Sequence, residues 1–193
     1  MQITISHFID AAKNVEGIAV IIDVFRAFSL AAFAMDKGAA RIIPVGDIEK
    51  ARRLKTVNPN FLLAGERHER KPDDFDFGNS PTHILNADIQ GKTLVHTTSA
   101  GTQGLTNALK AETVITGAFV NAGAIFRYIR KMSPEKVSLV AMGYAAEVET
   151  EEDNFCAEYI RNRLTGKENN FENMKRMIRE RSGKRFFVPE KKK

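Results

Sequence analysis

The stretch G-I-A-V-I-I, residues 17–22, followed directly by Asp23, decides how the chain folds. Its run of aliphatic residues contains no polar position, which is typical of a strand buried on both faces of a parallel sheet. Comparable runs recur along the chain and alternate with segments of helical periodicity, and this alternation predicts strands joined by helical crossovers. We therefore expect an α/β fold, a three-layer α/β/α arrangement around a largely parallel sheet, with mixed strand pairing left open.

The other elements follow from the same reading. Further strands are expected at residues 41–45, 61–64, 93–96, 113–116 and 137–141. Helices are expected over residues 27–37, 47–55, 102–109, 121–130, 151–164 and 168–181. Gly38 suits the end of the first helix, because glycine adopts the left-handed conformation that commonly follows a helix. No repeat, linker or break in composition marks a boundary, so residues 1–193 are expected to form one domain.

Composition excludes several classes of protein. The 193 residues are 43% hydrophobic and 27% charged, which is typical of a globular domain with a sizeable core and not of a disordered or fibrous chain. Much of the net charge of +5 lies in the stretch from Lys175 to Lys191–Lys193, and this stretch lacks the interleaving of aromatic and basic residues that is typical of nucleic-acid binding. The start lacks the pattern of a secretory signal, and no apolar run has the length of a membrane span. With Cys156 as the single cysteine, we expect a cytoplasmic protein without nucleic-acid or membrane partners.

Polar and glycine residues follow each predicted strand. They are Asp23 and Arg26; Gly65, Glu66 and Arg67; Thr97, Thr98, Gly101 and Thr102; Gly117 and Asn121; and Gly143. In an open parallel sheet the ligand crevice lies beyond the carboxyl ends of the strands. Each group on its own would only end its strand, but together they predict one site at one rim of the sheet.

The segment after the third strand carries more charge than a turn requires. It reads G-E-R-H-E-R-K-P-D-D-F-D-F-G-N-S-P over residues 65–81. Gly78, Asn79 and Ser80, followed by Pro81, are typical of a capped helix start that presents backbone donors. Residues 68–74 are interpreted as a solvent-facing spacer, and Asp76 is kept as a further acid to test.

Two kinds of charge meet at the predicted rim. Arg26 and Arg67 present planar forks suited to phosphate or carboxylate, and nearby helix starts favour anions. The carboxylates of Asp23, Glu152 and Asp153, together with Glu66, would repel an anion unless a cation offset them. Magnesium, which takes one or two carboxylates and completes its shell with water and phosphate oxygens, is the simplest such cation. The alternative for residues 151–153 is that they only occupy the favourable first turn of a helix capped by Thr150.

Several known phosphatase and nucleotide motifs fail on spacing. A haloacid-dehalogenase-type site needs a second Asp two residues after the first, but Phe25 stands there. A cysteine phosphatase needs an Arg six residues after its Cys, where this chain has Asn162. His68 is followed by Glu69 and not by the Gly of histidine phosphatases. No Walker or dinucleotide-binding glycine pattern is present, so nucleotide binding has no support.

The motifs taken together resemble a known family. They are I-D-V-F-R-A at 22–27, A-G-E-R at 64–67, F-D-F-G-N-S-P at 75–81, T-T-x-x-G-T at 97–102, F-V-N-A at 119–122, and E-D at 152–153 followed by C-A at 156–157. In this order and spacing they resemble the magnesium-dependent 2-phosphosulfolactate phosphatases of the ComB-like type. The resemblance implies a three-layer α/β/α fold and hydrolysis of a phosphate ester on a small sulfonated or carboxylated hydroxy acid, 2-phosphosulfolactate to sulfolactate and phosphate, on the route to coenzyme M.

On this resemblance we expect Mg²⁺ as the cofactor, with roles divided as follows. The expected catalytic residues are Asp23, Arg26, Glu66 and Arg67, and the expected metal ligands are Asp23, Glu152 and Asp153. The expected substrate-binding residues are Gly78, Asn79, Ser80, Thr97, Thr98, Gly101, Thr102 and Asn121. Direct attack by water and a covalent intermediate on Asp23 both stay open, as does assembly into a homo-oligomer.

The chain also departs from the family pattern. Phe28, Ala100 and Asn154 stand where the family usually has a hydroxyl, an amide and a carboxylate, and the chain ends soon after R-F-F-V-P at residues 185–189. The loss of the amide at Ala100 predicts a changed substrate specificity, and the loss of the carboxylate at Asn154 predicts weaker magnesium binding. The short C-terminus predicts an incomplete sheet edge or site. The second hypothesis is therefore a non-catalytic domain that binds anions or regulates another protein.

Overall fold

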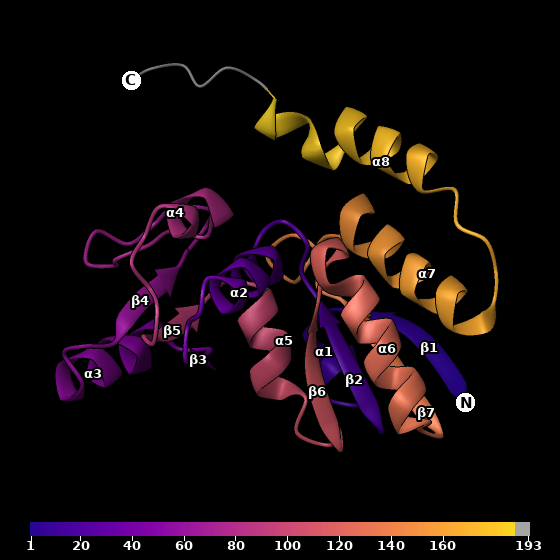
Figure 1. The fold of residues 1–193 in the computed structure, drawn as a ribbon, viewed down its shortest axis with the longest axis horizontal. Helices are drawn as coiled ribbons and strands as arrows, with labels where there is room; N and C mark the ends of the chain where they lie inside the picture. Colours follow the sequence, from indigo (N-terminus) through magenta and orange to yellow (C-terminus); the bar gives the residue numbers. More distant parts are fainter. Residues whose placement is uncertain (188–193) are drawn as a thin grey trace.

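The computed structural model describes residues 1–187, in which the strands form two parallel sheets. The first has the order β1-β7-β2-β6, made of Gln2–His7, Lys136–Ala141, Ile18–Ile22 and Thr113–Gly117. The second has the order β3-β5-β4, made of Arg41–Pro44, Thr93–Thr97 and Leu62–Gly65. Figure 1 shows the two sheets on either side of α2 and α5. The expected α/β fold with parallel pairing is confirmed.

The strand β2 is the central element of the first sheet. All its residues are buried, and it pairs with β6 on one side and β7 on the other. Ile22 is in register with Gly117 of β6 and with Ala141 of β7, so the three strands end at the same level. In the second sheet Gly65 is in register with Thr97 in the same way. Within each sheet, the residues that follow these strands are therefore brought to the same edge.

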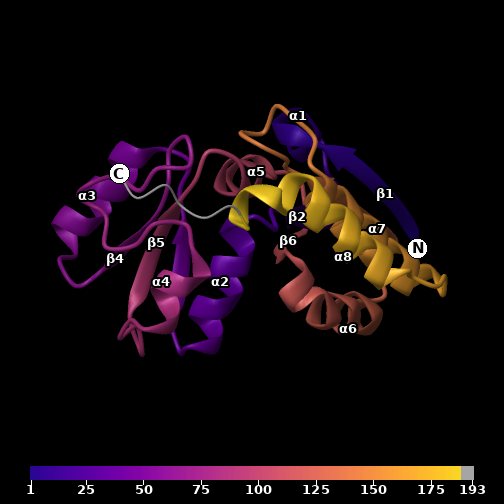
Figure 2. The ribbon, with the colours of Figure 1, turned by 90° about the horizontal axis from the view of Figure 1, so that it is seen from above.

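Helices cover both faces of each sheet. In the views of Figures 1 and 2, α1 (Phe8–Ala12) and α5 (Gly101–Asn107) lie behind the first sheet, and α6 (Ala122–Met132) and α7 (Glu151–Thr165) lie in front of it. The helices α2 (Ala27–Asp36), α3 (Ile48–Val57) and α4 (Pro81–Leu85) surround the second sheet. The short helix η1 (Phe119–Asn121) precedes α6, and α8 (Phe171–Glu180) with η2 (Ser182–Phe186) lies above α7 in Figure 1. The expected three layers are confirmed.

The apolar cores follow from the sheets. The larger core gathers β2 with side chains of α6 and α7, including Ile129 and the buried Cys156. The second sheet has a separate core on each face, because successive residues of a strand point to opposite sides. Leu94 of β5 belongs to one of these cores and Val95 to the other. Cys156 is thus a core residue, which agrees with the absence of cysteine-phosphatase spacing around it.

The element bounds agree closely with expectation, with three differences. The strand β1 and helix α1 were not expected, and α8 begins at Phe171 because the side chain of Asn170 caps it by accepting from Asn173 N at 3.0 Å.

The single expected sheet is wrong: β3 and β6 are edge strands of separate sheets, with a hollow of about 770 Å³ between them that α2 side chains also line. Pro44 in β3 has no N–H to donate across this gap, which fits an edge position.

Two further expectations concern the whole chain. Lys191–Lys193, the end of the basic tail, lies outside the described residues. None of the helices within residues 1–187 combines the length and the apolar character needed to cross a membrane. The expectation of one domain stays a prediction.

Candidate active site

A small cavity opens at the carboxyl ends of the strands in both sheets. Its volume is about 40 Å³. Its lining comes from the loops after β2, β4, β5 and β7 and from the loop before α4, and comprises Asp23, Phe25, Arg26, Glu66, His68, Glu69, Asn79, Ser99, Ala100, Gly143, Tyr144 and Ala145. The expected convergence of strand-end residues at one rim is therefore confirmed for the loops after four of the strands.

Asp23 lies at the floor of this cavity and is only 6% exposed. Its Oδ1 accepts a hydrogen bond from Ala27 N at 3.1 Å, and its Oδ2 accepts one from Gly101 N at 2.9 Å. Burial raises the pKa of Asp23 to about 7, with further upward contributions from the charges of Glu66 and Glu152, although the two backbone hydrogen bonds act against the rise. The carboxylate is held firmly in place and is costly to ionise without a cation.

Asp153 and Glu152 extend this acidic cluster from the first turn of α7. Asp153 accepts hydrogen bonds from Val24 N at 2.7 Å and from Gly143 N at 2.8 Å, so it ties the loop after β2 to the loop after β7. Burial, and then the charge of Asp23, raises the pKa of Asp153 well above its usual value. Glu152 is 2% exposed, and its Oε2 has no hydrogen-bond partner within the described residues.

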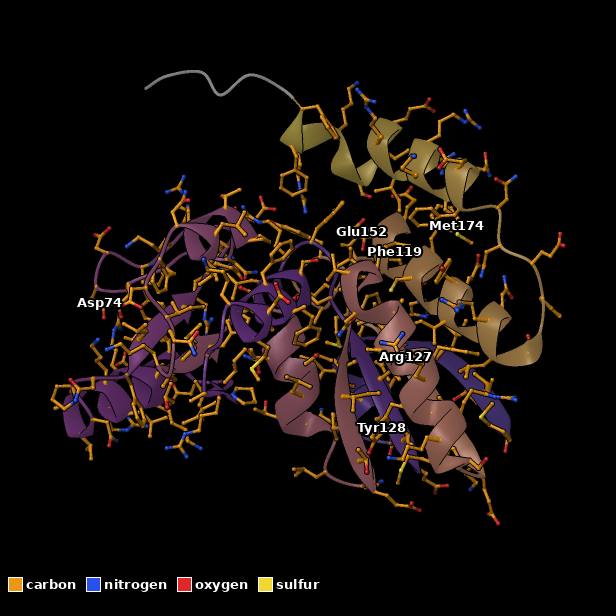
Figure 3. All side chains as sticks on the ribbon, viewed as in Figure 1. Asp74, Phe119, Arg127, Tyr128, Glu152 and Met174 are labelled. Carbon is orange, nitrogen blue, oxygen red and sulfur yellow. The ribbon has the colours of Figure 1, made fainter. Side chains whose placement is uncertain are left out.

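The position of Glu152 also bears on the helix-cap alternative. Figure 3 shows Glu152 at the end of α7 that lies near Phe119, away from the connection to α8. Thr150 is the N-cap of α7, but its side chain makes no capping hydrogen bond and its Oγ1 is buried without a partner in the described part of the chain. The expected first-turn position of the acids is confirmed, whereas the expected cap by the Thr150 side chain is wrong.

Glu66 approaches the cavity from the second sheet. Its Oε1 accepts a hydrogen bond from Ser99 N at 2.7 Å, and its Oε2 accepts from Glu69 N at 2.8 Å and from the Ser99 hydroxyl at 3.3 Å. Gly65, just before it, has a φ of +145°, and a Cβ there would lie 1.9 Å from Thr97 O. Only glycine allows this close approach of β4 to β5, and the approach aims the Glu66 carboxylate into the cavity.

The two expected arginines differ in their surroundings. Arg26 lines the cavity, and no atom of residues 1–187 accepts a hydrogen bond from its guanidinium, which lies over the Phe186 ring at 5.5 Å from the centroid. Arg67 instead donates to Glu66 O at 2.7 Å, Gly46 O at 3.0 Å and Thr97 Oγ1 at 2.7 Å. Burial lowers the pKa of Arg67. Arg26 is therefore placed to bind an anion, while Arg67 holds the loops together, and its role as a phosphoryl clamp stays a prediction.

The expected threonine and glycine contacts lie beneath the cavity and not in its lining. Thr98 and Thr102 bond to one another, through Thr98 N to Thr102 Oγ1 at 2.8 Å and Thr102 N to Thr98 Oγ1 at 3.1 Å. Thr97 Oγ1 accepts from Arg67, and Gly101 N donates to Asp23. These residues shape the loop after β5, and direct contact between any of them and a substrate stays a prediction.

The remaining expected substrate contacts are divided. Asn79 lines the cavity, and its Oδ1 lies 3.1 Å from Nε2 of the buried His96. Ser80 is the N-cap of α4 but makes no capping hydrogen bond with its side chain, which instead contacts the Thr82 hydroxyl. Asn121 accepts from Ala118 N at 2.8 Å and donates to Thr116 O at 2.9 Å, away from the cavity lining. Gly78 likewise is not in that lining.

The residues that depart from the family pattern lie in three different environments. Ala100 lines the cavity, so its small side chain can affect what fits there. Phe28 is fully buried in the main core. Asn154 Oδ1 lies 2.9 Å from His7 Nε2, and Asn154 Nδ2 donates to Glu149 Oε2 at 2.9 Å, so its side chain is engaged outside the acidic cluster.

Sequence reasoning missed some residues and overvalued others. Ser99, Tyr144, Arg185 and Phe186 were not among the expected site residues, although Ser99 lies within the T-T-x-x-G-T motif that could have indicated it. Asp76, kept as an acid to test, accepts from Leu63 N at 2.7 Å and lies 3.3 Å from Lys55 Nζ, so it supports β4 outside the cavity. A larger hollow, of about 1200 Å³, lies beneath α8, and its lining includes none of the buried carboxylates. The small cavity remains the better candidate because Asp23, Glu66 and Arg26 line it.

These features define an α/β protein with an acidic, anion-accepting site at the carboxyl ends of its parallel strands. More particularly, residues 4–182 match the family model described as 2-phosphosulpholactate phosphatase, and the chain belongs to that family.

Curated relatives support this assignment. One from Caldicellulosiruptor saccharolyticus, named "Probable 2-phosphosulfolactate phosphatase", is 40% identical over 164 residues, which cover 82% of this chain and 67% of the relative. A protein of the same name from Caldanaerobacter subterraneus is 40% identical over 67% of this chain and 53% of the relative. Another from Clostridium perfringens is 35% identical over 80% of this chain and 64% of the relative. The chain thus spans between about half and two thirds of the length of these relatives.

Proposed function

We propose that this chain is a phosphatase domain that hydrolyses the phosphate monoester of a small sulfonated or carboxylated hydroxy acid, with 2-phosphosulfolactate as the first substrate to test, and that it depends on Mg²⁺. The observation that carries the proposal is the pairing of the buried acids Asp23, Glu152 and Asp153 with Arg26, an arginine without a polar partner in residues 1–187. A cluster of carboxylates beside an available arginine suits a phosphate that arrives with a cation.

The donor set fits a magnesium ion of the kind that takes few protein ligands. Within the described residues no three His, Cys, Asp or Glu side chains form a ready-made metal cluster. Magnesium commonly takes only one or two carboxylates and fills its shell with water and substrate oxygens. Glu152 Oε2 lacks a hydrogen-bond partner, and each carboxylate oxygen of Asp23 and Asp153 keeps a second lone pair after accepting a backbone N–H. When bound, the cation would neutralise charge on the phosphoryl oxygens.

The chain's own residues divide the remaining work. Arg26 would hold phosphoryl oxygens through its planar fork. Glu66, held by Ser99 and by Glu69 N, would orient the attacking water and accept its proton. Arg67 would keep the loops after β3, β4 and β5 in register, which positions Glu66 through its bond to the Glu66 carbonyl. Positioning and charge neutralisation account for most catalysis of phosphoryl transfer, and these contacts are of that kind.

The experiment is phosphate release from a panel of phosphorylated hydroxy acids, measured with Mg²⁺ and with a chelator. We expect turnover of 2-phosphosulfolactate or a close carboxylated analogue only with the metal. Turnover that survives the chelator would contradict the magnesium requirement, and absence of turnover across the panel would contradict the phosphatase assignment. Beryllium fluoride trapping separates a covalent intermediate on Asp23 from direct attack by water, because only the first leaves a stable aspartyl analogue.

Calorimetry with the same compounds separates catalysis from binding alone. Binding of the phosphorylated acid without turnover would favour the second hypothesis, a domain that binds anions without hydrolysing them. The observation that favours this hypothesis is that Arg67 donates to two backbone carbonyls, so its guanidinium is occupied and not free to clamp a phosphoryl group.

A further inference from the structure

The helix η2 lies across the mouth of the candidate active site. Arg185 Nη1 lies 3.1 Å from Glu69 Oε1, and the Arg185 guanidinium lies over the Tyr144 ring at 5.9 Å. Phe186 packs edge-to-face on Phe25 at 5.1 Å between ring centroids. Each of these partners lines the cavity. Figure 2 shows the end of the yellow segment passing from above α7 to the region above α2.

The cavity beneath η2 is small for a whole phosphorylated hydroxy acid. Its volume of about 40 Å³ is only a few times the roughly 10–15 Å³ that a cavity needs to hold one water. A substrate whose phosphoryl group reached Asp23 and Arg26 would therefore extend its second acid group toward the mouth. The residues at the mouth are Glu69, Tyr144 and the two side chains of η2.

The charges at the site leave that second acid group without a partner. Among residues 1–187, Arg26 is the one arginine or lysine in the cavity lining, and Arg67 is engaged by Glu66 O, Gly46 O and Thr97 Oγ1. Arg185 is the further arginine that touches the lining. Its bond to Glu69 joins side chains that are 38% and 48% exposed, and such surface pairs are worth little. A bound carboxylate or sulfonate could therefore replace Glu69.

We propose that Arg185 is a specificity-determining residue that binds the second acid group of the substrate, and that Glu69 holds this arginine in place until the substrate arrives. The proposal rests on the proposed function. The planar fork of arginine suits a carboxylate or sulfonate, and the Tyr144 and Phe186 rings, at 5.9 Å and 5.0 Å from the guanidinium, keep it over the mouth. Arg185 lies beyond residues 4–182, the part of the chain that matches the family.

The test compares Arg185→Gln with Arg179→Gln. Arg179 is a matched control because it also lies over a phenylalanine, Phe187 at 4.9 Å, but lines the hollow beneath α8. We expect Arg185→Gln to raise the KM for 2-phosphosulfolactate about 10-fold to 100-fold, the scale of one charge-assisted hydrogen bond. Its kcat should change little, its kinetics with p-nitrophenyl phosphate should be unaffected, and Arg179→Gln should match the unmodified chain. An unchanged KM, or an equal rise for both substrates, would overturn the proposal.

Two further measurements keep the test independent of folding and of turnover. Glu69→Gln removes the competing carboxylate, so it should lower the KM for 2-phosphosulfolactate, a change that damage to the fold would not produce. If the unmodified chain hydrolyses no compound of the panel, the proposed function fails, and calorimetry with sulfolactate then decides the role of Arg185. Sulfolactate binding lost in Arg185→Gln but kept in Arg179→Gln would support the proposal, whereas equal binding by both variants, or none by the unmodified chain, would overturn it.

Discussion

Gly101 donates its backbone N–H to Asp23 Oδ2 at 2.9 Å, and a Cβ on Gly101 would lie 2.7 Å from that same oxygen. The hydrogen bond thus depends on the absence of a side chain. The same Cβ would also come within 3.0 Å of Ala27 and Phe28, which leaves it no direction in which to relax. The loop after β5 and the acid after β2 are therefore matched in shape, although they are far apart in the sequence.

Gly101→Ala should displace Asp23 and lower phosphatase activity by about 10-fold or more, because misplacing a catalytic group by about 1 Å is this costly. Stability should fall by about 1–3 kcal/mol, as for other overpacked cores. Gly123→Ala is the control, since the nearest atom to its Cβ would be Arg127 Nη1 at 3.6 Å and alanine favours a helix. Kinetics and urea unfolding check both variants, and full activity in Gly101→Ala would contradict this view of the Asp23 site.

The neighbouring acids Glu151 and Glu152 should respond differently to the same substitution. Glu152 is buried and its Oε2 lacks a partner in the described chain, whereas Glu151 lies 3.3 Å from Arg181 at the surface. If Glu152 contributes to the magnesium site, Glu152→Gln should weaken Mg²⁺ binding by about 10-fold or more, the scale of one lost charge-assisted contact. It should also raise the melting temperature without metal, because a buried unpaired charge is costly.

Calorimetric titration with Mg²⁺ and thermal unfolding in a chelator measure both effects, with Glu151→Gln as the control. Equal Mg²⁺ affinity in the two variants would remove Glu152 from the expected metal ligands. A lower melting temperature in metal-free Glu152→Gln would show that the carboxylate has a partner that stabilises the fold.

Arg26 and Arg67 should separate into a binding residue and a positioning residue. Arg67→Gln removes hydrogen bonds to Gly46 O and Glu66 O, so it should lower the stability by about 2 kcal/mol or more as well as the activity. Arg26→Gln should lower the activity about 100-fold, the usual scale for one preorganised charge, and change the stability by less than about 0.5 kcal/mol. Urea unfolding beside the phosphatase assay gives both quantities. A destabilised Arg26→Gln, or an Arg67→Gln that loses activity without stability, would reverse the assignment.

The fold was largely predictable because it rests on local patterns. The wholly apolar run of β2 required burial on both faces, and the helix between residues 151 and 164 ended within one residue of the prediction. The strand β1 was not expected, although Ile3 and Ile5 alternate with polar residues in the pattern of a half-buried strand. The split between β3 and β6 leaves a hollow lined by α2 side chains, an arrangement between distant elements that no local pattern records.

The site was predictable in position but not in detail. Strand ends in register within each sheet bring the loops after β2 and β7, and those after β4 and β5, to a common edge, which could be expected from the strands. The meeting of Asp23 and Glu66 across the two sheets could not, because it depends on how the sheets pack. The direction of each side chain could not be predicted. Thr98 and Thr102 bond to each other, and Arg67 bonds to backbone carbonyls, because of how the loops pack and not because of a local sequence pattern. Arg185 reaches the mouth only through the course of α8 and η2 and had no motif to indicate it.

His96 should make the stability of the chain depend on pH. It is buried in β5, and burial lowers its pKa from 6.5 to about 4. The unfolded chain therefore binds a proton below pH 6.5 that the folded chain does not accept until about pH 4. Stability should be unaffected by this group above pH 6.5, fall as the pH decreases through that window, and be lower by about 3 kcal/mol below it. Urea unfolding at pH 7 and pH 5 measures the fall. His96→Gln, which can still bond to Asn79 but does not titrate, should show a smaller difference, and an equal difference in both proteins would contradict the role of His96.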